Sequence, residues 1–174
     1  TFAGKLEYSM KKVNIISLGC SKNLVDTELL MKQLEKAGYG VEVDVENSKA
    51  KIVVINTCGF IGNADSDSLQ LLKLYAKRKS ECKIKELWVM GCYSQKRGEK
   101  LRIDIPEVDR IYGNFDWENI LVELGSKSLI THERTLTTPI HYAYLKISEG
   151  CNSPCSYCIK PKINGPLTSY DIKE

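Results

Sequence analysis

Residues 13–38 read VNIISLGCSKNLVDTELLMKQLEKAG, and this stretch determines which fold we expect. The apolar run from Val13 to Leu18 is typical of a buried strand. From Ser21 to Ala37 the apolar side chains recur close to helical spacing, and Gly38 is a typical residue at which a helix stops. A buried strand followed at once by a helix is the repeating unit of an α/β domain.

The same alternation of strand and helix continues as far as Gly125. Further strands are predicted at Val41–Val45, which reads as half-exposed or as an edge, and at Ile52–Ile55, Leu87–Met90 and Val108–Tyr112. Helices are predicted from a cap at Asp65 or Ser66 through Ala76, from Gln95 to Leu101, and from a cap at Asp116 to Gly125. Residues 11–125 are therefore predicted to form a mostly parallel sheet flanked by helices.

The composition changes after Gly125. Residues 126–141 are polar and rich in threonine at first, without clear periodicity, and are predicted to be a linker. A new apolar strand is predicted at Tyr142–Ile147, ahead of a cluster of cysteines. Only 16 residues follow Cys158, so the domain that begins at Tyr142 is expected to be cut short.

The overall composition restricts the class of protein. With 174 residues, 43% hydrophobic and 27% charged, the chain reads as an ordinary globular protein. Its apolar runs are too short to span a bilayer and no signal peptide is visible, so we expect a cytoplasmic protein without a membrane partner. A net charge of +3 permits a nucleic-acid or ribosomal partner without arguing for one. Seven cysteines without an export signal suggest metal ligation, nucleophilic catalysis or core packing rather than disulfides.

Three cysteines each follow a predicted buried strand, and a glycine adjoins each of them. The cysteines are Cys20, Cys58 and Cys92, and the glycines are Gly19, Gly59 and Gly91. Because the loops at the carboxyl ends of parallel strands converge on the ligand-binding edge, we expect the three thiols to share one rim. Glycine would let a bulky cofactor approach the backbone. Packing as small buried hydrophobes is the alternative, and it fits any one of these cysteines better than all three.

The seventh cysteine, Cys82, differs from these three. It lies in a connection rich in lysine and glutamate and has no adjoining glycine. We therefore predict that Cys82 is a thiol that binds no metal.

Three more cysteines, Cys151, Cys155 and Cys158, form a C-x3-C-x2-C motif within eight residues. Such a set indicates zinc or an iron–sulfur cluster. Zinc would need a fourth ligand, but no Cys or His follows Cys158, and His141 lies beyond the predicted strand. Three ligands suit a [4Fe–4S] cluster whose open iron could bind S-adenosylmethionine. Tyr157 lies within the motif, where its ring would either approach the adenine or pack under the loop.

Several segments resemble a known family. The motif from Cys151 to Cys158 resembles the radical S-adenosylmethionine signature. The segments Leu18–Glu28 (LGCSKNLVDTE), Asn56–Ile61 (NTCGFI) and Met90–Cys92 (MGC) resemble the N-terminal domain of the methylthiotransferases. Within that family, the sequences around Cys20 and Cys58 look more like those of the ribosomal-protein aspartate enzymes than those of the tRNA adenosine enzymes. The resemblance covers roughly residues 11–174.

This resemblance implies a set of cofactors and partners. Cys20, Cys58 and Cys92 would hold an auxiliary [4Fe–4S] cluster, and Cys151, Cys155 and Cys158 would hold the radical-generating one. S-adenosylmethionine would supply both a methyl group and a radical, with electrons from a donor protein. The product would be a 3-methylthio-aspartate on a small-subunit ribosomal protein.

The resemblance also implies that residues 142–174 are the first strand and cluster loop of a truncated radical (β/α) barrel. The chain alone is then expected to lack turnover. One departure from the family is that Pro166 follows Gly165, where a basic residue is common. Two other functions remain open, namely a tRNA adenosine methylthiotransferase and a non-enzymatic iron–sulfur or zinc module. Asn23 and Asp26 are expected to have structural roles near the Cys20 loop.

Overall fold

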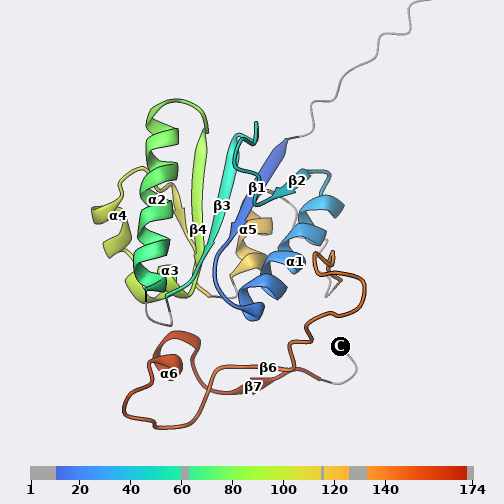
Figure 1. The fold of residues 1–174 in the computed structure, drawn as a ribbon, viewed down its shortest axis with the longest axis vertical. Coiled ribbons are helices and arrows are strands. Elements are labelled where there is room, and N and C mark those ends of the chain that lie inside the picture. The colour runs from blue at the N-terminus through green and yellow to red at the C-terminus, as the bar shows by residue number, and fades with distance from the viewer. Residues whose placement is uncertain (1–10, 60–62, 115, 126–132, 172–174) are drawn as a thin grey trace, which may run out of the picture.

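The computed structural model describes residues 11–59, 63–114, 116–125 and 133–171. Five strands form one sheet in the order β2-β1-β3-β4-β5, and every neighbouring pair is parallel (Figure 1). The strands are β1 (Lys12–Ser17), β2 (Gly40–Val43), β3 (Ile52–Thr57), β4 (Glu86–Gly91) and β5 (Arg110–Ile111). The predicted α/β class with a mostly parallel sheet is confirmed.

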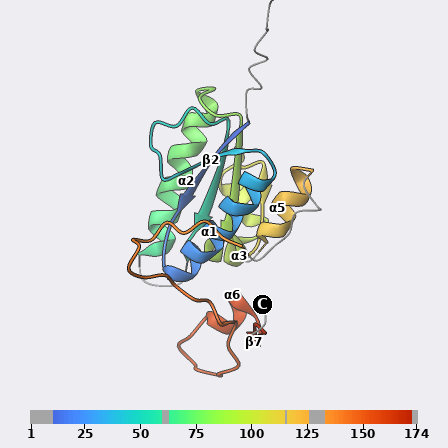
Figure 2. The same cartoon turned by 90° about the vertical axis from the view of Figure 1, so that its right-hand side faces the viewer.

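Helices cover both faces of the sheet (Figure 2). One face carries α1 (Ser21–Lys36) and α5 (Trp117–Glu123), and the other carries α2 (Ala64–Ser80), α3 (Cys92–Arg97) and α4 (Lys100–Asp104). Along β3, Val53 and Ile55 pack toward α2, whereas Val54 packs toward α1 and α5. A strand buried on both faces needs apolar residues at every position, which is why these strands were predictable as unbroken apolar runs.

Two predicted helix starts differ from the structure. The helix predicted from Gln95 to Leu101 is divided at Gly98, whose φ is +52°, and its first part already begins at Cys92. The predicted cap of α2 at Asp65 or Ser66 is wrong, because the helix follows Asn63. Asp65 instead pairs with Lys96 of α3, with a Nζ–Oδ2 distance of 2.6 Å.

The strand predicted at Tyr142–Ile147 is wrong. Within the described residues this segment pairs with no strand, and Leu145 and Ile147 are 83% and 68% exposed. Pairing begins only at β6 (Ser148–Glu149), which is antiparallel to β7 (Thr168–Ser169). Between β6 and β7 lie the three cysteines of the C-x3-C-x2-C motif and the short helix α6 (Lys160–Asn164).

Residues 133–149, which we name the strap, run beside α1. Residues 126–132 of the predicted linker lie outside the described residues. The strap binds polar side chains of α1: Gln33 donates to the carbonyl of Glu133 at 3.0 Å, and Glu28 accepts from the backbone N–H of Thr137 at 2.7 Å. Among the described helices, none is long and apolar enough to cross a membrane.

Candidate metal centre

Cys20, Cys58 and Cys92 all lie at the carboxyl edge of the sheet. Cys58 directly follows β3, Cys92 directly follows β4, and Cys20 is the residue before α1. The strand order reverses between β1 and β3, and this switch point is where open α/β sheets bind their ligands. Cys20 and Cys58 lie on the two sides of this switch point. The prediction that the three cysteines share one edge of the sheet is confirmed.

Two glycines let the cysteine loops pack closely together. Gly19 has a φ of +104°, and a Cβ at this position would lie 2.7 Å from Cβ and 2.9 Å from Sγ of Cys58. Gly91 has a φ of +98°, and its Cβ would lie 2.4 Å from the carbonyl oxygen of Thr57. The sequence suggested that glycine makes room for a cofactor. In the structure these glycines make room for the neighbouring loop.

Asn23 connects all three loops. Its side chain is buried, and Nδ2 donates to the carbonyl oxygens of Leu18 at 2.9 Å and Thr57 at 3.0 Å. Its Oδ1 lies 4.0 Å from Sγ of Cys92 and accepts from that thiol. The predicted structural role of Asn23 at the Cys20 loop therefore extends to the loops of Cys58 and Cys92.

Burial and neighbouring thiols act together on Cys92, which is only 8% exposed. Burial raises the pKa of Cys92 to about 11 because it disfavours the thiolate, and negative charge on Cys58 and Cys20 adds to this rise. The three thiols therefore lie within electrostatic reach of one another. A bound cation such as iron or zinc would stabilise all three sulfurs as thiolates.

The donor set fits a soft metal, although its side chains do not converge on one point. In the described part of the chain, no three His, Cys, Asp or Glu side chains are arranged to hold a metal ion. Cys20 is exposed and Cys58 half-buried, so both can reach a group placed above the edge. Three thiols on three loops are chemically suited to an iron–sulfur cluster or to zinc.

The second set of cysteines lies in the loop between β6 and α6. Figures 1 and 2 place this loop beyond the carboxyl edge of the sheet. The backbone N–H of Cys151 donates to Gly165 at 3.1 Å, and the backbone N–H of Lys160 lies 3.4 Å from Sγ of Cys158. The backbone N–H and then the hydroxyl of Ser153 lower the pKa of Cys151 by stabilising its thiolate, with smaller contributions from Lys160 and Lys22.

Tyr157 and Cys82 are both exposed at the surface. Tyr157 is 90% exposed, so it does not pack under its loop, and a role beside adenine stays a prediction. Cys82 is exposed and follows α2, whereas the cysteines of the edge follow strands β1, β3 and β4.

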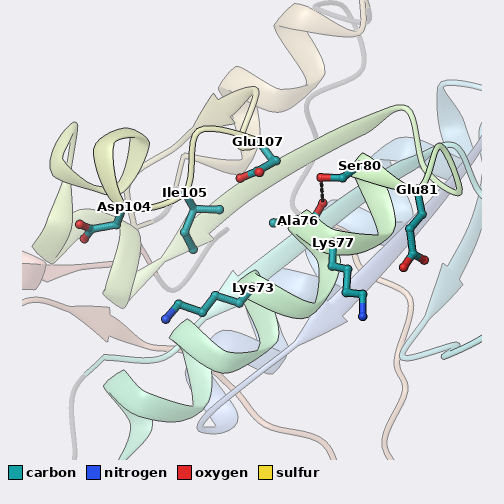
Figure 3. Close-up of a pocket in the computed structure, with 8 residues that line it drawn as sticks. All are labelled: Lys73, Ala76, Lys77, Ser80, Glu81, Asp104, Ile105 and Glu107. Carbon is teal, nitrogen blue, oxygen red and sulfur yellow. Dashed lines mark hydrogen bonds between the residues drawn. The ribbon is translucent and has the colours of Figure 1, made fainter.

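A hollow of about 480 Å³ between α2 and α4 is lined by none of the cysteines (Figure 3).

Sequence reasoning missed Lys146. Asp26, for which a structural role near the Cys20 loop was expected, is the sixth residue of α1 and is buried. Its Oδ1 lies 2.5 Å from Nζ of Lys146, at the far end of the strap. No local signal could reveal this pairing, because the partners are 120 residues apart in sequence.

The fold and the site define a doubly wound α/β protein with cysteines at the switch point and a second cysteine loop beside them. Residues 12–113 match the uncharacterized protein family UPF0004. Because this match covers more than half of the chain, the protein belongs to that family.

Curated relatives are similar over nearly the whole chain. It is 53% identical over 166 residues to the ribosomal protein uS12 methylthiotransferase RimO of Bacteroides thetaiotaomicron. Proteins of the same name from Phocaeicola vulgatus and Cytophaga hutchinsonii are 51% and 42% identical. The alignments cover 93–94% of this chain but only 38% of each relative, so the chain spans about two fifths of their length.

Proposed function

We propose that this chain belongs to an iron–sulfur radical S-adenosylmethionine methylthiotransferase that modifies ribosomal protein uS12. The observation that carries the proposal is the placement of two cysteine trios at one end of the sheet, one on its carboxyl edge and one in the adjacent loop. The names of relatives up to 53% identical agree with this activity and this substrate. The finer parts of the proposal are C3 of an aspartate as the modified atom, a separate electron-donor protein and a cytoplasmic location.

Each trio has a distinct role in this proposal. Cys20, Cys58 and Cys92 bind the auxiliary [4Fe–4S] cluster, while Cys151, Cys155 and Cys158 bind the radical-generating one. When bound, the two clusters and S-adenosylmethionine supply the electron, the carbon radical and the sulfur for the reaction. The residues of the chain hold and orient these groups.

Asn23 and Tyr157 have supporting roles. Asn23 joins the three edge loops through its bonds to Leu18, Thr57 and Cys92. Tyr157 is exposed on its loop and is available to contact the adenine of S-adenosylmethionine.

Iron analysis tests the metal part of the proposal. After anaerobic reconstitution with iron and sulfide, the chain should bind about eight irons, as two [4Fe–4S] clusters require. Replacing Cys20, Cys58 and Cys92 together by Ala should leave about four irons, and so should replacing Cys151, Cys155 and Cys158. Cys82→Ala is the matched control and should keep all eight. One zinc and no iron would contradict the proposal and favour a zinc module.

The substrate is tested on a full-length enzyme that contains this chain. We expect mass spectrometry to detect methylthiolation of uS12 and none of tRNA adenosine. Turnover by the 174-residue chain alone would contradict our expectation that it is inactive. Modification of tRNA would favour the sister enzyme class.

A further inference from the structure

Lys146 is a buried lysine that joins two distant parts of the chain. Its side chain is 6% exposed, and Nζ pairs with Asp26 of α1 at 2.5 Å and with Glu149 of β6. The side chains of Asp26 and Glu149 are 4% and 9% exposed. Lys22 of α1 also pairs with Glu149, at 3.6 Å. Four charged groups from α1, the strap and β6 therefore form one network.

A buried ionic network of this kind needs all of its members. Taking a lysine and a carboxylate out of water is unfavourable, and only close pairing offsets the loss of hydration. If one partner is removed, the other remains as an uncompensated charge. The network therefore tolerates few positions of the strap against α1. An apolar contact of the same area would allow more positions, because apolar packing is not directional.

The network lies between the two cysteine trios. Asp26 is one helical turn after Asn23, which contacts Cys92, so both side chains are on the same side of α1. Glu149 is two residues before Cys151. A hollow of about 340 Å³, lined by Lys22, Lys146, Lys160 and residues nearby, separates the amino end of α1 from the strap.

Two of the contacts beyond the network are weaker. At the other end of the loop, Asn114 donates to Asn164 of α6 at 3.1 Å. Along the strap, Lys36 of α1 pairs with Glu133 at 2.9 Å, but its side chain is 26% and that of Glu133 is 64% exposed. Water screens such an exposed pair, so it constrains the strap far less than the buried one does.

We propose that Lys146 is a positioning residue that fixes the Cys151–Cys158 loop beside the edge bearing Cys20, Cys58 and Cys92, and so sets the separation of the two candidate cluster sites. The structural part of this proposal, that Lys146 places the loop, depends only on the residues of this chain. The consequence for the reaction rests on the proposed function.

Hydrogen–deuterium exchange on the metal-free chain tests the structural part. The backbone hydrogen bonds near the network lie in the β6–β7 pair and in the bonds from Tyr170 to Ile147 and from Cys151 to Gly165. We expect Lys146→Met to raise exchange at least tenfold in peptides covering residues 148–151 and 168–170, with β1, β3 and β4 unchanged. Lys36→Met is the matched control and should leave exchange in these two peptides at the wild-type rate. Asp26→Asn keeps a hydrogen-bond acceptor for Lys146 and should give an intermediate increase, so it carries the test if Lys146→Met does not fold. Unchanged exchange in both Asp26→Asn and a folded Lys146→Met would overturn the proposal.

A second readout concerns the full-length enzyme with its clusters loaded. Lys146→Met should keep the wild-type iron content and cleave S-adenosylmethionine, while the methylthio product formed per cleavage falls at least tenfold. Lys36→Met should keep the wild-type ratio. An unchanged ratio in Lys146→Met would overturn the consequence for the reaction. Failure of the wild-type protein to bind iron would overturn the proposed function, and the exchange experiment would still decide whether Lys146 places the loop.

Discussion

Gly91 meets two separate constraints, a backbone angle and a lack of space. Its φ is +98°, and an added Cβ would lie 2.4 Å from the carbonyl oxygen of Thr57. Gly38 shares the first constraint with a φ of +83°, but nothing lies within 4 Å of its Cβ position. Gly38→Ala should therefore cost only the conformational penalty of about 1–2 kcal/mol. Gly91→Ala should lower the free energy of unfolding by more than about 4 kcal/mol, because the backbone of β3 at Thr57 cannot move aside. Equal losses in urea unfolding would contradict this explanation.

Asn23 should matter for stability as well as for the metal site. Asn23→Ala leaves the carbonyl oxygens of Leu18 and Thr57 without their donor and is expected to cost about 2–3 kcal/mol. Asn119→Ala is the control, because Asn119 is exposed and bonds only to Asp116 among the described contacts. That control should stay within about 0.5 kcal/mol of wild type in denaturant unfolding. If Asn23→Ala lowered the free energy of unfolding as little as the control does, the three loops would not depend on Asn23.

Cys92 should be slow to react in the metal-free protein. Its pKa is raised to about 11 from an ordinary value of 9.0. The reactive thiolate exists above the pKa, so at pH 8 its population falls about 100-fold. Alkylation by iodoacetamide, followed by peptide mass spectrometry, should label Cys92 about 100-fold more slowly than the exposed Cys82. Similar rates for the two would mean that Cys92 is not held in a buried site.

At the scale of elements, α1 marks where sequence reasoning succeeded and where it ended. Its start, its length and its contacts through Leu30 and Leu34 were predictable, because helical periodicity is a local property. Its buried polar residues were not: Asp26, Glu28 and Gln33 bind strap residues about 100 or more positions later. Polar residues on a helix usually face water, so only the folded chain reveals such partners.

The predicted strand at Tyr142–Ile147 failed for a related reason. An apolar run predicts a strand only when other strands are available to pair with it. In the described part of the chain this segment has no strand neighbour, and its side chains at Leu145 and Ile147 remain exposed. The strands at Ile52–Ile55 and Leu87–Met90 were predicted correctly because the sheet lies on both sides of each of them. The common edge of Cys20, Cys58 and Cys92 followed directly from those strands.

The strap depends on Glu28, whose side chain is 1% exposed. This carboxylate accepts from the backbone N–H and the hydroxyl of Thr137 and pairs with Arg134. Glu28→Ala removes all three contacts, so trypsin should cleave after Arg134 at least about tenfold faster as local opening becomes easier. Glu35→Ala, which removes an exposed contact to Thr135, is the control and should leave the cleavage rate near wild type. Equal acceleration in both variants would argue against a special role for Glu28.

At the scale of the whole molecule, the buried side chains that form the two apolar cores in the described part of the chain lie within residues 13–121, and Leu124 packs against one core. A chain that ends at Gly125 should therefore fold and unfold cooperatively. Asp26 and Glu28 lose their partners in that chain but regain water, so the loss of stability should be only about 1–3 kcal/mol. Urea unfolding followed by circular dichroism measures this. A shortened chain without a cooperative transition would mean that the strap is part of the core.

The position of Lys146 in the chain also orders events during protein synthesis. The amino-terminal sheet domain is made first, and a ribosome adding about 5–20 residues per second needs roughly 3–10 s to travel from Cys92 to Lys146. During that interval Asp26 is still hydrated and the loop of Cys151 does not yet exist. The three thiols of the edge are thus made before the second set, and in our proposal the pairing of Lys146 with Asp26 then places the newly made Cys151 loop beside them.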